Sequence, residues 1–215
     1  MLSILTKRDV FYIKNMNEFE WDKKLKIHTT GRDDSHADEH HHPYEATPYA
    51  VLKRLAESGY IGKGNMLVDY GCGKGRVGFF LNHEIGCSAV GLEYDETIYT
   101  QAMKNLESYA TKDQVKFFCQ RAEEFEIEDA DCFYFFNPFT VEILRAVMSR
   151  IMESYYEKPR TMRLFFYYPD DEYVSFLLAG GVGNEVNFLD EIDCRDLFEG
   201  EDSRERILIF EISDW

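Results

Sequence analysis

The sequence predicts an α/β fold built on a seven-stranded, mostly parallel sheet, with an antiparallel C-terminal strand and helices on both faces. Strand patterns alternate with helical patterns, which is the order that parallel βαβ units require. The strands are nearly continuous apolar runs, as expected where helices cover both faces of a sheet. The last two strands are separated by about a dozen residues, too few for a crossover helix, so they are expected to form an antiparallel hairpin.

Helical and strand patterns follow one another along the chain from Thr47 to Ile212. A helix begins with Thr47 as N-cap and Pro48 as its first residue, and ends near Gly59. Further helical patterns follow the glycine-rich segment near residue 75 and cover Thr97–Tyr109 and Val141–Tyr156. The seven strand patterns are Met66–Tyr70, Ser88–Glu93, Val115–Cys119, Cys132–Phe136, Met162–Tyr168, Val186–Ile192 and Arg206–Ile212.

Length and composition indicate a single domain with an extension. A chain of 215 residues that is 45% hydrophobic and 30% charged can bury one substantial core. We expect residues 1–43 to form an N-terminal extension or lid that is partly flexible, and residues 44–215 to form the main domain. The arm Met1–Trp21 is expected to fold over the active-site edge or to pack on another subunit, and the oligomeric state stays open.

Charge and cysteine usage narrow the partners and the compartment. The net charge is −16, so the average surface repels phosphate backbones and anionic lipids, and nucleic acid is a less favoured partner than a small molecule or a protein. Five scattered cysteines lack zinc or disulfide spacing and indicate reduced thiols in a cytoplasm. Charges near the N-terminus interrupt any signal peptide or membrane span, so we expect neither export nor insertion into a membrane.

The acidic segment Asp33–His42 raises a metal hypothesis that we do not favour. It carries imidazoles beside carboxylates, and both are ligands for zinc or nickel. Adjacent histidines in a flexible segment rarely converge on one ion without a scaffold, so no metal site is predicted. The histidines concerned are His36, His40, His41 and His42.

The most informative segment follows the first predicted strand, where Asp69 precedes the alternating Gly71, Gly73 and Gly75. Glycines at every second position permit a tight strand-to-helix turn and close approach of a nucleotide cofactor to the backbone. The acid at Asp69 repels a pyrophosphate and suits the ammonium of S-adenosylmethionine (SAM), so SAM is favoured over NAD. The spacing from Gly73 to Gly78 also satisfies the dinucleotide fingerprint, so an oxidoreductase that binds NAD(P) or FAD is the alternative.

The segment Val68–Gly75 resembles the first motif of class I SAM-dependent methyltransferases, and the seven-strand order fits their Rossmann-like fold over about residues 45–215. The resemblance implies that Gly71, Cys72, Gly73 and Gly75 lie against the methionine and ribose parts of SAM. It further implies that Glu93, with Tyr94 beside it, takes the ribose hydroxyls. A carboxylate suits this role because its two oxygens accept hydrogen bonds from vicinal hydroxyls.

The adenine contact departs from the family pattern. The family usually places an acid after the third strand, whereas Arg121 stands at the aligned position here. We therefore expect Gln120, or backbone amides near Ala122, to recognise adenine. The loop before the first strand commonly caps the cofactor in this family, so Tyr44, Glu45, Thr47 and Tyr49 are expected near the methionine end. A purely structural interpretation, with Thr47 as a helix cap and the tyrosines as packing, stays open.

The segment Asn137-Pro138-Phe139 is similar to the fourth motif of that family, although it lacks the usual second proline. It indicates an amine acceptor, because an Asn oxygen and a neighbouring carbonyl accept hydrogen bonds from NH₂ while the ring stacks on a planar substrate. An oxygen or charged amine needs a base, for which Glu45 and Tyr44 are the candidates.

The predicted function is transfer of a methyl group from SAM to an unidentified acceptor, with an amine of a small molecule or protein favoured. Besides the oxidoreductase, the alternative is a SAM-binding or protein-interaction module without catalysis.

Overall fold

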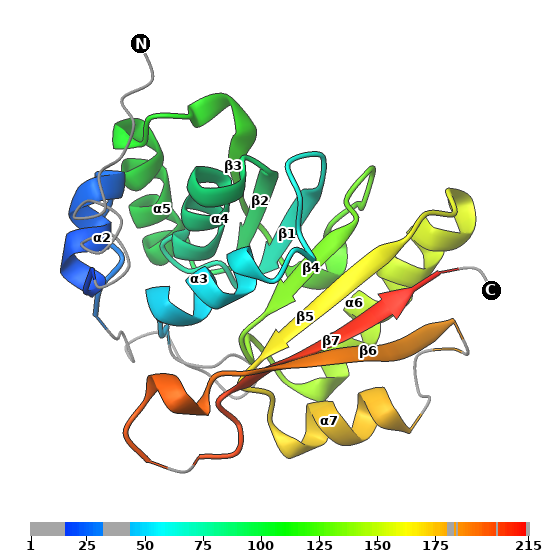
Figure 1. Ribbon diagram of the computed structural model, residues 1–215. Helices are drawn as coiled ribbons and strands as arrows, with labels where there is room; N and C mark the ends of the chain where they lie inside the picture. Colours follow the sequence, from blue (N-terminus) through cyan, green and yellow to red (C-terminus); the bar gives the residue numbers. More distant parts are fainter. Residues whose placement is uncertain (1–15, 32–43, 180–182, 184, 201, 214–215) are drawn as a thin grey trace.

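The computed structural model describes residues 16–31, 44–179, 183, 185–200 and 202–213. They form a seven-stranded sheet in the order β3-β2-β1-β4-β5-β7-β6 (Figure 1). β7 runs antiparallel to both β5 and β6, and the other paired strands are parallel. The predicted fold class is thus confirmed. The strands are β1 (Met66–Tyr70), β2 (Ser88–Glu93), β3 (Val115–Cys119), β4 (Cys132–Phe135), β5 (Met162–Tyr167), β6 (Val186–Asp193) and β7 (Arg206–Ile212).

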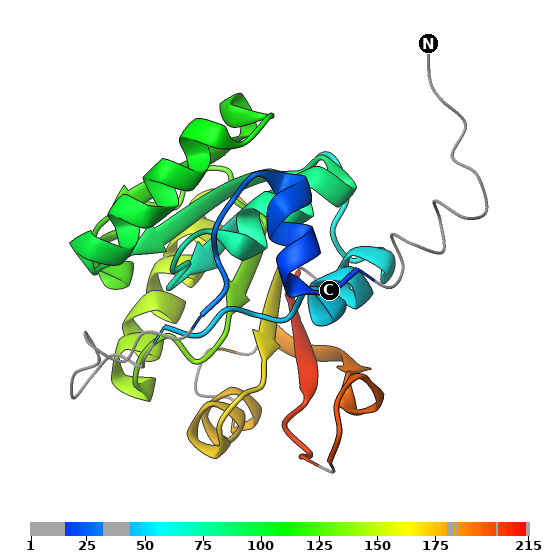
Figure 2. The same ribbon diagram turned by 90° about the vertical axis from the view of Figure 1, so that its left-hand side faces the viewer.

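Helices cover both faces of the sheet, because successive strand residues point to opposite sides and both sides are apolar. On one face pack α2 (Glu18–Leu25), α3 (Tyr49–Glu57), α4 (Arg76–Ile85) and α5 (Glu96–Ser108), and α2 faces the viewer in Figure 2. On the other face pack α6 (Val141–Glu157) and α7 (Asp171–Leu178). Short 3₁₀ turns lie at Lys112–Gln114, Ala122–Glu124 and Arg195–Leu197.

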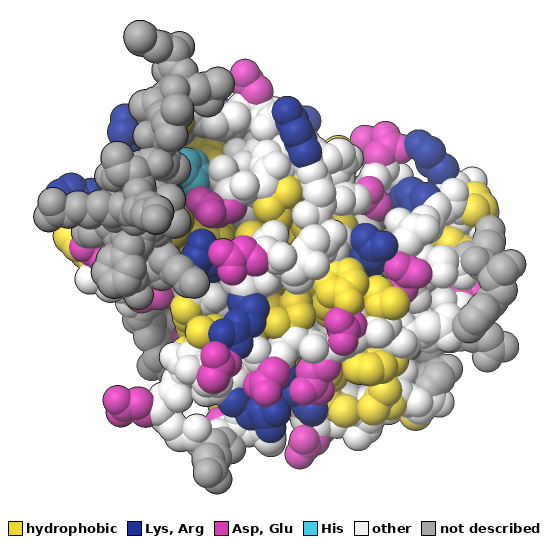
Figure 3. All heavy atoms as spheres, in the orientation of Figure 1, with side chains coloured by type: hydrophobic (Ala, Val, Ile, Leu, Met, Phe, Trp, Pro, Cys, Tyr) yellow, Lys and Arg dark blue, Asp and Glu magenta, His cyan; other side chains and the backbone are white. Residues whose placement is uncertain are grey.

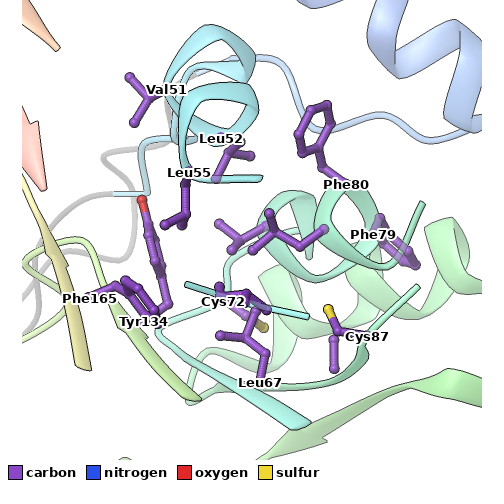
Figure 4. Close-up of a cluster of buried hydrophobic side chains, with 14 of the residues drawn as sticks. Val51, Leu52, Leu55, Leu67, Cys72, Phe79, Phe80, Cys87, Tyr134 and Phe165 are labelled. Atoms are coloured by element: carbon purple, nitrogen blue, oxygen red, sulfur yellow. The ribbon is translucent and has the colours of Figure 1, made fainter. Parts of the chain in front are cut away.

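The core on the α3 and α4 side includes Cys72 of the glycine-rich loop (Figure 4). Leu52 and Leu55 of α3 and Phe80 of α4 are fully buried there against Leu67 of β1. Tyr134 of β4 belongs to the same cluster, and its hydroxyl points toward the start of α3. This apolar layer fixes the strand ends on which the site is built.

The N-terminal part of the chain differs from the prediction. The arm predicted over Met1–Trp21 is described from residue 16 onward, and it contains the start of a helix that was not predicted, α2, which begins at Glu18. Asn17 and Glu20 form a reciprocal capping box that starts this helix, a signal that the sequence carries. Trp21 is only 2% exposed and stacks on Tyr49, so α2 is part of the core. Residues 1–15 and the segment Asp33–His42 lie outside the described residues.

Other boundaries differ for local reasons. Thr47 is not the cap of α3: Pro48 occupies the N-cap position, and the Thr47 hydroxyl instead lies 3.1 Å from the Tyr134 hydroxyl. β4 and β5 each end one residue earlier than predicted, at Phe135 and Tyr167. The chain turns soon after each strand, because Asn137 and Tyr168 both have a positive φ. α7 was not predicted; it begins at the side-chain cap of Asp170.

Candidate functional site

A cleft lies at the carboxyl ends of β1, β2 and β4, where parallel α/β sheets bind their ligands. It encloses about 980 Å³, open mouth included. It brings together most of the predicted site residues, from five separate segments: Tyr44, Glu45, Thr47, Asp69, Gly71, Cys72, Glu93, Tyr94, Ala122, Asn137, Pro138 and Phe139. Further lining residues were not predicted, namely Ala46, Arg76, Val77, Leu92, Asp95, Ile98, Glu123, Tyr134, Phe136 and Ile143.

The glycine-rich loop turns sharply between β1 and α4. Gly71, Gly73 and Gly75 all have a positive φ, at 70°, 56° and 89°, which side chains rarely tolerate. A Cβ atom would lie 2.4 Å from Pro138 at Gly71 and 2.2 Å from the Tyr44 ring at Gly73. The glycines therefore permit both the turn and the close packing of the cleft walls. Gly73 and Gly75 belong to the loop without lining the cleft themselves.

Asp69 lines the floor of the cleft, near the carboxyl end of β1. It is 3% exposed, and its Oδ2 atom is buried without a hydrogen-bond partner among the described residues. Burial raises the pKa of the Asp69 carboxyl to about 8, and the nearby Glu93 charge adds to the shift. A buried oxygen without a partner is costly, so this atom suits a cationic ligand group that donates hydrogen bonds.

Glu93, at the end of β2, ties the loop to the neighbouring strand. Its two carboxyl oxygens accept hydrogen bonds from the backbone N–H of Gly73, at 3.0 Å, and of Asp95, at 2.9 Å. Burial raises the pKa of Glu93, and these backbone hydrogen bonds partly offset the shift. A carboxylate accepts about four hydrogen bonds, so it retains capacity for a pair of hydroxyls from the cleft.

The far end of the cleft lies beside the turn after β3. Gln120 and Arg121, which were predicted there, do not line the cleft. The Gln120 backbone N–H donates to the Glu93 carbonyl, and Arg121 is an exposed residue paired with Glu123 at 3.5 Å. Ala122 and Glu123 line the cleft instead, because the 3₁₀ turn returns the chain toward it. An acid two positions after the family's usual one was the signal in the sequence for Glu123.

The segment Tyr44–Thr47 lines the cleft on its open side. The Tyr44 ring covers Gly73, and its hydroxyl donates a 2.6 Å hydrogen bond to the Thr29 carbonyl. Burial raises the pKa of Tyr44, which keeps the hydroxyl protonated. Glu45 is exposed at the mouth. Tyr49 does not line the cleft; it is buried with its hydroxyl 2.6 Å from Asp22, as the packing interpretation predicts.

Arg76 is the lining residue with the most polar contacts to the N-terminal segment, and its role was not predicted. It is the first residue of α4 and only 4% exposed. Its guanidinium donates to the Thr29 hydroxyl at 2.7 Å, to the Thr47 carbonyl at 3.1 Å and to the Glu18 carboxylate. An arginine at the positive end of a helix dipole is unfavourable by itself, and this was the signal that the sequence offered.

The segment Asn137-Pro138-Phe139, which was predicted to form the acceptor site, follows β4. The Asn137 side chain donates to the Tyr168 carbonyl at 2.6 Å and accepts from the Asp170 N–H at 3.3 Å. Phe139 is 3% exposed, with its ring edge-on to Tyr70, so it forms part of the cleft wall. The half-buried ring of Phe136 lies closer to the mouth, beside Tyr168.

Neither a metal cluster nor a membrane span is found in the described part of the chain. No group of three His, Cys, Asp or Glu side chains there is arranged to hold a metal ion. None of the helices in that part is long and apolar enough to cross a bilayer. The histidines at positions 36, 40, 41 and 42 lie outside it.

Comparison with known proteins agrees with this geometry. A family described as "Methyltransferase domain" matches residues 67–157, which run from β1 to the end of α6. No curated protein matches the sequence.

Among solved structures, the chain resembles an RNA methyltransferase from Salinibacter ruber in complex with S-adenosyl-L-homocysteine, with 18% identity and a TM-score of 0.53 over 80% of this chain and 95% of that one. It also resembles a TehB-like SAM-dependent methyltransferase from Corynebacterium glutamicum, with 14% identity and a TM-score of 0.53 over 76% and 88% of the two chains. A protein of the NADB-Rossmann superfamily from Streptococcus agalactiae has 18% identity and a TM-score of 0.56 over 80% and 71%. These identities establish a shared fold.

Proposed function

We propose that this SAM-dependent methyltransferase of the class I type binds SAM along the carboxyl ends of β1 and β2 and methylates an amine that approaches beside β4. The observation that carries the proposal is the buried Oδ2 of Asp69 at the floor of the cleft, which has no hydrogen-bond partner within the described part of the chain. An ammonium group would satisfy this oxygen and neutralise its charge, whereas a pyrophosphate would be repelled. The same atom therefore argues against NAD(P) or FAD as the ligand.

The other contacts follow from the order of residues along the cleft. Glu93 and Tyr94 would hold the ribose. The backbone of the glycine-rich loop would lie against the cofactor, at Gly71, Cys72, Gly73 and Gly75. Ala122 and Glu123 would face the adenine, with the Glu123 carboxylate accepting from the exocyclic amine. Gln120 and Arg121 would support this turn from outside the cleft.

SAM supplies the methyl group and the sulfonium that makes it electrophilic. The protein's own part is to hold donor and acceptor at reacting distance and to exclude water. Pro138 and Phe139 would form the wall behind the acceptor nitrogen, and the backbone turn held by Asn137 would orient it. For a charged amine, Glu45 is the favoured base, because the Tyr44 hydroxyl is already engaged as a donor to the Thr29 carbonyl.

An amine of a small molecule or a protein fits this chain better than a nucleic acid. The net charge is −16, and on the face shown in Figure 3 basic side chains lie interspersed with acidic ones. The excess of acidic over basic residues repels a phosphate backbone and attracts a cationic acceptor. We further propose that the protein works in the cytoplasm, with residues 44–215 as the methyltransferase domain and residues 1–43 as an N-terminal extension, of which the described part packs on the domain through α2.

Calorimetric titration with SAM, its product S-adenosylhomocysteine (SAH) and NAD tests the donor. Heat of binding is expected with SAM and SAH only. Asp69→Ala and Glu93→Ala should each weaken SAM binding by about 1.5–3 kcal/mol, the scale of a lost hydrogen bond to a charged group. Unchanged affinity in both variants would refute the site. An SAH-release assay with a panel of amines and peptides tests the acceptor, and binding without any turnover would favour a non-catalytic module.

A further inference from the structure

Arg76 occupies a position that is unfavourable for an arginine. It is the first residue of α4, where the positive end of the helix dipole disfavours a cation. The side chain is also 4% exposed, so its charge must be compensated by hydrogen bonds and acids. The contacts that compensate it come from the segment before the family match, which begins only at residue 67.

One guanidinium joins three separate parts of the chain. It binds the Glu18 carboxylate at the start of α2, the Thr29 hydroxyl after that helix, and the Thr47 carbonyl at the cleft. The other Glu18 oxygen accepts the Tyr49 N–H at 3.0 Å, which fixes the start of α3. The Glu18–Arg76 pair therefore holds α2, α3 and α4 against one another at the rim of the cleft.

Asp22 of α2 holds the next part of this segment. It accepts hydrogen bonds from the Thr29 N–H and hydroxyl, at 2.7 and 2.6 Å, and from the Thr30 N–H and hydroxyl, both at 3.0 Å. Burial raises the pKa of Asp22, but the hydrogen bonds from Thr29 and Tyr49 and the Arg76 charge more than offset this, so the net pKa is lowered. The Thr29 carbonyl in turn accepts from Tyr44, whose ring covers Gly73.

We propose that residues 17–30 support the donor site from outside the cleft, and that Arg76 is the positioning residue through which this segment sets the shape of the methionine end. The inference rests on the proposed function, because it assumes that SAM binds in the cleft. Arg76 holds the Thr47 carbonyl and the Tyr44 ring packs on Gly73, within the loop that follows Asp69, whereas the proposed adenine end is at Ala122 and Glu123. Loss of the Arg76 connection should therefore affect the amino-acid part of the donor and spare its adenosine.

The test compares two ligands that differ at this end only. SAH carries the complete amino-acid part, and 5′-methylthioadenosine lacks it. Arg76→Lys keeps the positive charge but loses the planar guanidinium group that donates to several acceptors at once. We expect SAH binding to weaken about tenfold, the effect of about one charge-assisted hydrogen bond. Binding of 5′-methylthioadenosine should change less than about twofold. Arg195→Lys, at an exposed ion pair with Asp193, is the matched control and should leave both affinities unchanged.

A second readout separates positioning from catalysis. Arg76 holds residues 17–30 in place without reaching the acceptor side, so Arg76→Lys should raise KM for SAM while kcat at saturating SAM stays nearly constant. Equal weakening of SAH and 5′-methylthioadenosine would mean a general structural role and would overturn the proposal. So would unchanged SAH binding, or a fall in kcat at constant KM.

A gentler variant keeps the test decisive if Arg76→Lys does not fold. Glu18→Gln removes the carboxylate charge at a side chain that is 42% exposed, and should give the same selective loss of SAH affinity to a smaller extent. Glu57→Gln, at the exposed pair with Lys53 on α3, is its control. Equal effects of Glu18→Gln on both ligands would overturn the proposal. A wild-type protein that binds neither ligand would refute the proposed function itself, and this inference with it.

Discussion

The side-chain amide of Asn137 donates a 2.6 Å hydrogen bond to the carbonyl of Tyr168, and both residues have a positive φ, at 39° and 49°. They follow the neighbouring strands β4 and β5 at the acceptor side of the cleft. Left-handed backbone at residues other than glycine costs of the order of 1 kcal/mol each and persists only where the surroundings impose it. This hydrogen bond joins the two strained turns, together with the one that Asn137 accepts from the Asp170 N–H.

Asn137→Ala removes both of its hydrogen bonds and leaves the Tyr168 carbonyl without its donor. We expect the free energy of unfolding to fall by about 1–3 kcal/mol and turnover to fall further, because the wall of the acceptor site loosens. Urea unfolding and an SAH-release assay measure the two effects. Asn187→Ala, which removes a 3.1 Å side-chain hydrogen bond on the edge strand β6, is the control. Wild-type turnover in Asn137→Ala would contradict the role.

Gly73→Ala should impair SAH binding strongly. A Cβ atom there would lie 2.2 Å from the Tyr44 ring, on a backbone with φ of 56°. In a Tyr44→Ala background the steric part of the penalty should disappear, while a backbone cost of about 1–2 kcal/mol remains. Calorimetric affinities of the four variants of this cycle measure the coupling. Gly64→Ala is the control, since a Cβ atom at that residue would meet no other part of the described chain within 4 Å. Additive effects at 73 and 44 would exclude the contact.

The pH dependence of stability should report on Asp69. Its pKa is about 8 in the ligand-free fold, against about 3.9 in an unfolded chain, so the folded state binds the extra proton between these values. The free energy of unfolding contributed by this group therefore falls as pH rises from about 4 toward about 8. Asp69→Asn should remove this slope, as urea unfolding at several pH values would measure. A parallel slope in the variant would contradict the assignment.

The affinity for SAM should depend on pH in the opposite direction to stability, because it requires Asp69 to be ionised. A cationic donor binds the ionised Asp69, so SAM affinity should rise between about pH 6 and 7.5 as deprotonation becomes less costly. In Asp69→Asn the affinity should be low and nearly independent of pH over this range. Titration calorimetry at fixed ionic strength measures both curves, and a flat curve in the wild type would count against Asp69 as the ammonium ligand.

Glu45→Gln tests the proton-transfer step. Glu45 is exposed at the mouth of the cleft, so the substitution should leave thermal stability unchanged. With a charged amine as acceptor, kcat/KM should fall and lose its dependence on the ionisation of an enzyme base. Glu107→Gln, on the exposed side of α5, is the control for loss of one surface charge. Equal rates across pH would remove Glu45 from this step.

The sheet and the approximate place of the site could be predicted from the sequence. Strand patterns depend on local alternation and apolar runs, and the carboxyl ends of adjacent parallel strands must meet at one edge. Asp69, Glu93 and the loop from Gly71 to Gly75 were therefore expected together, and they lie together. The antiparallel ending of the sheet followed likewise from the short connection before β7.

Which side chains face the cleft, and whether their carboxyl groups are protonated, depends on the packing of the whole chain. Arg76 stands in the glycine-rich segment, yet its role depends on Glu18 and Thr29, more than forty residues earlier in the chain. Thr47 stands before Pro48, where the sequence predicts a helix cap, but its hydroxyl pairs with Tyr134 of a distant strand. The raised pKa of Asp69 comes from burial by residues of several elements. Such long-range contacts and desolvation leave no local pattern in a sequence, because they are properties of the packed chain.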